Sequence, residues 1–277
     1  MTGDAQVRER RIETTVGPLA VRIHEMRPGL PTALLWHSLF VDSRTWARVE
    51  DELGAERRLI EIDGPGHGRS GDPGRRYSMD DCAVAACEVL DALGVTEPVD
   101  WLGNAWGGHV GIVLASRWPD RLRTLGTVDT PIDAYGRKGL METRLLLALH
   151  RVLGPVRYLQ NALTDVLLSQ RTRARDPEAV ALVSSSFADA DPVAMRNAVV
   201  SISLRRTNLA PLLPEIEVPT LFVTGAEHQE WPLERARAAA ELLPHGSFEV
   251  LEHSAYLGPL EVPRELGALV RRHWARE

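Results

Sequence analysis

Short apolar runs alternate with amphipathic helical patterns along most of the 277-residue chain, and no other feature of the sequence constrains its fold as strongly. Each run is continuously apolar, which is typical of strands buried on both faces of a sheet. Strands that alternate with helices predict an α/β fold, with a mostly parallel sheet and helices on both of its faces. The predicted strands span residues 32–37, 58–63, 99–103, 122–129, 220–224 and 247–251.

Two segments depart from this alternation. Near the amino end, two extended patterns are joined by Gly17 and Pro18, which predicts a hairpin of residues 11–16 and 19–25. Residues 132–208 contain helical patterns and no convincing strand. We therefore expect an inserted helical cap at 132–208, on an α/β core formed by residues 1–131 and 209–277. The helical patterns of the cap cover residues 140–152, 156–168, 177–187 and 193–204.

One helix start is marked by its own chemistry. Ser78 stands three residues before Asp81, the spacing at which the two side chains can each bond the other residue's backbone N–H in a capping box. The helix that follows has one apolar face and is expected to end at Gly94.

Composition and charge exclude several classes of partner. The net charge is −6 and the basic residues are dispersed singly or in pairs, which argues against nucleic acid. Cys82 and Cys87 lack zinc spacing and no signal peptide is evident, which indicates a reducing, cytoplasmic location. No apolar run is long enough to span a bilayer, so we expect no membrane partner. No residue spacing indicates a metal, and no motif indicates a cofactor.

The motif Gly103-Asn104-Ala105-Trp106-Gly107 lies at a predicted strand-to-helix junction. Glycines two residues before and two after the centre permit a very tight turn, which exposes the central side chain above the sheet. The Trp106 N–H lies at a helix start, where negative charge is favoured. This geometry suits a nucleophile, but alanine has no group with which to attack.

From Arg11 to Trp274 the chain resembles the α/β-hydrolase family. Residues 63–70 (Asp-Gly-Pro-Gly-His-Gly-Arg-Ser) are similar to its D-x-P-G-x-G-x-S loop, and His37-Ser38 is similar to its oxyanion H-G segment. Residues 103–107 match G-x-S-x-G apart from the serine. The resemblance implies that Ala105 occupies the nucleophile position and that Leu39 and Trp106 donate the oxyanion-hole N–H groups.

At the acid and base positions the chain departs from the family pattern. The usual acid position holds His228, which cannot serve as a carboxylate, although Glu227 and Glu230 lie nearby. Some members carry the acid after the preceding strand instead, where this chain has Asp129, and we prefer Asp129.

A gapless alignment of the family's final motif places Tyr256 at the histidine position, whereas a short register shift places His253 there. A tyrosine with a pKa near 10 is a poor base at neutral pH, so the chemistry favours His253.

Two origins of Ala105 are open. It is either a serine-to-alanine substitution that inactivates a hydrolase, or a native residue of a variant that uses a His/Asp base without a serine nucleophile. Because His228 and Tyr256 also depart from the family pattern, natural divergence is the preferred interpretation.

The resemblance and the apolar composition of the cap predict an enzyme acting on a small apolar ester, lactone or related carbonyl compound. The alternative is a non-catalytic binding protein for a small molecule. His37, Ser38, Tyr256 and Trp231 are expected to line the pocket. The leucine-rich stretch 140–150 fits either a homodimer contact or a cover over that pocket.

Overall fold

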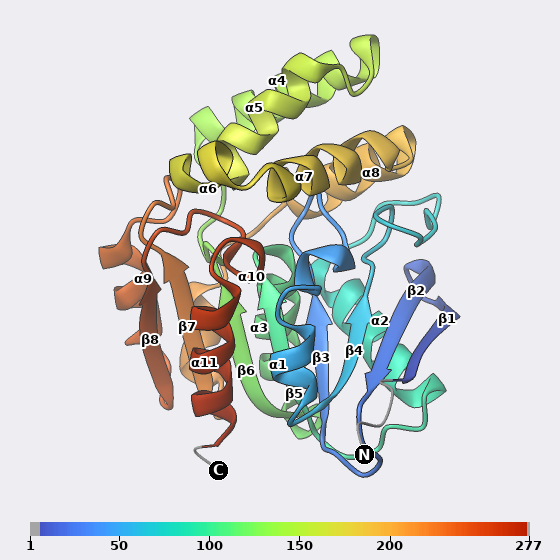
Figure 1. Cartoon of the computed structure of the whole chain (residues 1–277), viewed down its shortest axis with the longest axis vertical. Coiled ribbons are helices and arrows are strands. Elements are labelled where there is room, and N and C mark those ends of the chain that lie inside the picture. The colour runs from blue at the N-terminus through green and yellow to red at the C-terminus, as the bar shows by residue number, and fades with distance from the viewer. Residues whose placement is uncertain (1–5, 276–277) are drawn as a thin grey trace.

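The computed structural model describes residues 6–275, and eight strands within them form one sheet (Figure 1). The strand order is β1-β2-β4-β3-β5-β6-β7-β8. Strand β2 is antiparallel to both of its neighbours, and all other neighbouring pairs are parallel. The strands are β1 (Gln6–Thr14), β2 (Gly17–Glu25), β3 (Thr32–Trp36), β4 (Arg58–Ile62), β5 (Val99–Asn104), β6 (Leu122–Val128), β7 (Thr220–Gly225) and β8 (Gly246–Leu251).

Helices cover both faces of this sheet, as the sequence predicts. Alternate residues of β3 point to opposite faces, so Ala33 and Leu35 pack with α1 and α11, whereas Leu34 and Trp36 pack in the core that contains α2, α3 and α9. These helices are α1 (Glu50–Gly54), α2 (Met79–Ala92), α3 (Trp106–Arg117), α9 (Leu233–Ala240) and α11 (Pro263–Trp274). The short elements are η1 (Ser43–Trp46), η2 (Pro119–Arg121), η3 (Ala210–Glu215) and α10 (Gly258–Glu261).

Five further helices, which we call the cap helices, lie over one end of the sheet (Figure 1). They are α4 (Arg137–Leu153), α5 (Arg157–Leu167), α6 (Gln170–Arg175), α7 (Pro177–Asp189) and α8 (Pro192–Ile202). An apolar cluster joins them to the core, because Leu159 and Phe187 of the cap pack with Val41 and Leu257 of the loops beneath. The sequence pattern does not separate α6 from its neighbours, because six residues are too few to show a helical period.

Local sequence signals account for several boundaries. Ser78 and Asp81 form the predicted capping box at the start of α2. The amino-terminal hairpin is present, and its first strand begins at Gln6 rather than at residue 11. Its turn requires Gly17, whose φ of 87° is strained for any residue with a side chain. Both cysteines are free, with Cys82 buried and Cys87 half-buried.

Candidate functional site

The turn between β5 and α3 places residue 105 in a strained conformation. Ala105 has φ 47° and ψ −99°, a combination that residues with a Cβ rarely adopt. Its N–H donates to the Val128 carbonyl at 2.8 Å, which ties the turn to the neighbouring strand. A Cβ on Gly107 would lie 2.0 Å from the Trp36 carbonyl oxygen, so only glycine fits there. The sharp turn that the glycine spacing predicts is therefore present, although its central side chain is alanine.

A cavity of about 490 Å³ lies above this turn, between the carboxyl ends of the strands and the cap helices. Ala105 and Trp106 form part of its floor, and residues of α4, α5 and the segment after α8 form its walls and roof. The lining residues from the core are Ser38, Leu39, Phe40, Ala105, Trp106, His109, Gln229, Glu230 and Tyr256. Those from residues 132–208 are Tyr135, Lys138, Glu142, Thr143, Leu146, Ala162, Leu163, Val166, Leu167, Ile202, Ser203 and Arg206.

The loop after β3 brings a backbone amide to the same cavity. His37 is fully buried, with Nδ1 lying 2.6 Å from the Ser38 carbonyl and Nε2 accepting from the Gly64 N–H at 2.8 Å. These two contacts require a neutral imidazole with its proton on Nδ1, and burial lowers the pKa of His37 accordingly. His37 therefore holds the loop that presents Leu39, and it lies outside the cavity lining.

Trp106 supplies a second amide near Ala105. Trp106 is the first residue of α3, so no preceding turn of the helix offers a carbonyl group to accept from its N–H. Both Leu39 and Trp106 line the cavity, and their role as oxyanion-hole donors remains a prediction. Trp231, by contrast, is buried outside this lining, with its ring 5.7 Å from the Arg235 guanidinium carbon.

Tyr256, and not His253, reaches the cavity from the loop after β8. The Asn104 side-chain amide donates to the Tyr256 carbonyl at 3.0 Å, which anchors this loop beside the turn at residue 105. The Tyr256 ring lies against His228, with ring centroids 4.5 Å apart. The structure thus groups Ala105, Tyr256 and His228. Ala105 holds the nucleophile position, His228 holds the usual acid position, and the gapless alignment of the final motif places Tyr256 at the histidine position.

Neither ring in this group is charged near neutral pH. Burial lowers the pKa of His228 to about 3, and neither ring nitrogen has a hydrogen-bond partner among the described residues. Burial also raises the pKa of Tyr256 well above its usual value, and nearby Tyr135 and Glu230 add to this. A neutral phenol at the base position cannot accept the nucleophile's proton, and a neutral imidazole at the acid position cannot replace the carboxylate of a serine triad.

No hydrogen bond joins Asp129 to His253 among the described residues. Asp129 is fully buried with φ 49°, and its Oδ1 accepts from the Gly225 N–H at 2.7 Å. Its Oδ2 has no hydrogen-bond partner among the described residues, and burial raises the pKa of Asp129 well above its usual value. His253 is exposed in the turn that follows β8 and has φ 61°. The roles that sequence reasoning gave these two residues remain predictions.

Charged groups enter the cavity that was expected to be apolar. The Arg206 guanidinium lies 4.4 Å from the centre of the Tyr135 ring, and its buried Nε has no hydrogen-bond partner within the described chain. Glu230 lines the cavity while exposed to solvent; partial desolvation raises its pKa, and Arg206 partly opposes this effect. No local pattern marks Arg206, because it lies in the irregular segment between α8 and η3.

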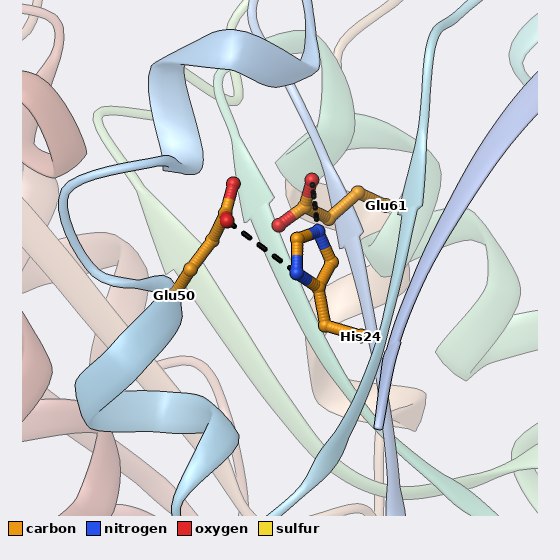
Figure 2. A group of neighbouring side chains, drawn as sticks. All are labelled: His24, Glu50 and Glu61. Atoms are coloured by element: carbon orange, nitrogen blue, oxygen red, sulfur yellow. Dashed lines mark ion pairs between the residues drawn. The ribbon is translucent and has the colours of Figure 1, made fainter. Parts of the chain in front are cut away.

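A second polar cluster lies away from the cavity, where β2, β4 and α1 meet. Figure 2 shows the His24 ring between the carboxylates of Glu50 and Glu61, with nitrogen–oxygen distances of 3.4 and 3.5 Å. The three ligand atoms lie within 4.8 Å of one another, close enough to hold a metal ion. However, Arg22 Nη1 already contacts both carboxylates, at 3.2 and 3.1 Å. This guanidinium supplies the positive charge that the cluster needs.

Burial of the second cluster shifts the pKa values of Glu61 and His24. Burial raises the pKa of Glu61 to about 7, although His24 opposes the shift. Burial disfavours charged His24, but its contacts with Glu61 and Glu50 outweigh this and raise its pKa. We interpret the cluster as an ion-pair network that holds α1 against the sheet.

A glycine-flanked turn over a parallel sheet, beneath a helical layer, defines the architecture of an α/β-hydrolase. The sequence also matches the profile of the Alpha/beta hydrolase family over residues 33–269, and the chain therefore belongs to the α/β-hydrolase family.

Relatives and solved structures resemble the chain over nearly its whole length. It is 28% identical to the 2-hydroxymuconate semialdehyde hydrolase of Pseudomonas putida, over 92% of this chain and 86% of that protein. A thermophilic esterase from Thermogutta terrifontis has a TM-score of 0.86 and 26% identity, over 97% of this chain and 98% of its own. The enol-lactonase of Burkholderia xenovorans shares the fold, with a TM-score of 0.88 and 21% identity, over 96% and 100% of the two chains.

No helix in the described part of the chain is long and apolar enough to cross a membrane.

Proposed function

We propose that the cavity above Ala105 takes a small carbonyl compound and that the protein acts on it without a covalent acyl-enzyme. The observation that carries this proposal is the grouping of Ala105, Tyr256 and His228 beside one cavity. All three triad positions hold groups that cannot perform acyl transfer, whereas the strained turn and the two amide donors remain. A laboratory change of one serine would alter one of these positions, so we take Ala105 to be native.

In this proposal, the amides of Leu39 and Trp106, which both line the cavity, stabilise a carbonyl oxygen that gains negative charge. Glu230 is the best candidate for a base, because it lines the cavity while still exposed to solvent, and its partial desolvation raises its pKa above the usual value. In the proposed step, Glu230 removes a proton from the carbon next to the carbonyl group. The electron pair moves onto the carbonyl oxygen to give an enolate, and the same carboxylic acid returns the proton to carbon.

Arg206 favours a substrate that carries a negative charge of its own. Its guanidinium lines the cavity, and its Nε lacks a hydrogen-bond partner among the described residues. An arginine held against an aromatic ring in a half-buried site is well suited to bind a carboxylate. We therefore propose a small oxo acid or an acidic enol lactone, rather than the uncharged apolar ester that composition suggested.

Proton exchange at carbon tests this proposal directly. The protein is incubated with 2-oxobutyrate in D2O, and the loss of the C3 proton signal is followed by NMR. We expect exchange faster than in buffer, lost in Glu230→Gln and retained in Glu234→Gln, a matched change at an exposed site on α9. Exchange that is unaffected by Glu230→Gln would refute the assigned base.

A non-catalytic binding protein is the second candidate, and it is favoured by the neutral state of His228 and Tyr256. Ligand-induced thermal stabilisation separates the two functions. Stabilisation by 2-oxobutyrate without proton exchange would favour simple binding. In either case Arg206→Met is expected to weaken the stabilisation, while Arg205→Met, at the exposed neighbouring position, does not.

A further inference from the structure

Helix α4 presents an apolar stripe that nothing in the described chain covers. Of its seventeen residues only His150 is buried. Met141, Leu145, Ala148 and Val152 follow one another at intervals of four, three and four residues, which places them on one side of the helix. All four are exposed, with exposed fractions of 67% at Met141, 58% at Leu145 and 80% at Val152. Isolated exposed apolar residues are ordinary, but a continuous stripe marks an interaction surface.

The stripe continues into the turn between α4 and α5. Leu153 at the end of α4, Val156 in the turn and Tyr158 at the start of α5 are exposed, Tyr158 by 73%. Figure 1 shows α4 and α5 as the outermost layer of the cap helices, at the end of the molecule opposite both termini. A tyrosine among aliphatic side chains at a projecting turn is typical of groups that enter a membrane–water interface. We call the α4 stripe and these three residues the outer cap face.

Charge around the outer cap face differs from that of the rest of the chain. Residues 137–169, which contain α4, the turn and α5, hold five of the 32 basic residues and two of the 38 acidic ones, a net charge of +3 in a chain whose total is −6. The remaining residues therefore carry a net charge of −9. Arg144, Arg151 and Arg157 are all exposed beside the stripe. Such a separation of charge would orient the molecule toward an anionic surface with this face first.

We infer that the outer cap face docks on the surface of an anionic lipid bilayer. Apolar side chains flanked by arginines match the acyl boundary and the headgroup charges of such a surface. A second copy of the chain fits less well, because a two-fold contact through this face would bring two regions of net charge +3 together. The docked helix is also the one that lines the cavity through Glu142, Thr143 and Leu146.

Flotation of the full-length protein with vesicles tests the inference. One vesicle preparation is phosphatidylcholine alone, and the other contains about one-third phosphatidylglycerol. We expect binding to the anionic vesicles that is at least about tenfold stronger than to the neutral ones and that falls as salt is added. Leu145→Glu with Val152→Glu should abolish this binding, whereas Leu242→Glu, at an apolar residue exposed elsewhere, should not.

Charge reversal supplies an independent readout. Arg144→Glu with Arg151→Glu should weaken binding to anionic vesicles, while Arg264→Glu on α11 leaves it unchanged. Far-UV circular dichroism establishes that each variant is folded. The inference is overturned if the folded protein binds neither vesicle, or if Leu242→Glu reduces binding as much as the stripe variant does. It is also overturned if a dimer that the stripe variant disrupts forms in lipid-free buffer, because the face then belongs to a second copy.

Discussion

Rebuilding a serine triad at the three altered positions should convert this chain into an esterase. The combined variant Ala105→Ser, Tyr256→His and His228→Asp places a hydroxyl, an imidazole and a carboxylate at residues that already lie beside one cavity. The turn at residue 105 already has φ 47°, so a serine there needs no new backbone conformation. The loop that carries position 256 is fixed by the Asn104 hydrogen bond at 3.0 Å.

The expected gain follows from what the structure already supplies. Loss of the serine or of the histidine from a working triad costs about 10⁶ in rate, nearly as much as loss of all three residues. Each tenfold corresponds to about 1.4 kcal/mol of transition-state stabilisation, so a full triad is worth roughly 8 kcal/mol. Because the new side chains are not positioned by evolved neighbours, we expect about half of this, a gain of roughly 10³ in kcat/KM.

Ala105→Ser alone should give no gain, because the neutral Tyr256 cannot accept the serine proton. Hydrolysis of p-nitrophenyl acetate and butyrate measures the rates, and thermal unfolding establishes that each variant is folded. A large gain from the single serine would refute this reasoning, since it would require another base, such as His253. A folded combined variant with no gain would show that the Leu39 and Trp106 amides do not form a working oxyanion hole.

Three further outcomes are expected. Gly107→Ala should lower the free energy of unfolding, measured by urea titration, by about 3 kcal/mol or more, because its Cβ would lie 2.0 Å from the Trp36 carbonyl oxygen. Gly136→Ala serves as the control, because no atom lies within 4 Å of the added Cβ there. The pKa of Glu61 is raised from 4.5 to about 7 in the folded state, so the folded protein holds its proton more tightly. Stability should therefore fall as the pH rises from about 4.5 to 7, by up to about 3 kcal/mol, and Glu61→Gln should flatten this slope in urea titrations at several pH values. His253→Ala should leave proton exchange with 2-oxobutyrate unchanged, because the side chain is exposed outside the cavity; a loss of exchange would restore His253 as a candidate base.

The fold was predictable because its signals are local and repeated. Continuous apolar runs and intervening amphipathic helices specify a buried parallel sheet, even when the order of the strands within the sheet is not known. The capping box at Ser78 and the tight turn around Ala105 depend on residues three or four apart, so their geometry is also set by the chain itself. The short helix α6 was not predicted, because its existence depends on packing against α5 and α7.

The candidate site was only partly predictable, because its residues come from separate loops. Sequence spacing located Ala105, Leu39 and Trp106, which belong to motifs with a fixed backbone role. The choice between Tyr256 and His253 depends on how the loop after β8 leaves the sheet, and a register shift of three positions decides which side chain turns inward. Arg206 belongs to no motif, and only the path of the chain from α8 to η3 brings it to the cavity.

The sequence by itself determined the sheet, its covering helices and the sharp turn at residue 105, since each follows from periodicity or from backbone freedom at nearby glycines. Tertiary structure alone decided that Tyr256 lies against His228, that Arg206 and Glu230 share one cavity, and that none of residues 6–275 covers the α4 stripe. The physical reason is that burial and charge environment depend on groups far apart in the chain, whereas local conformation does not.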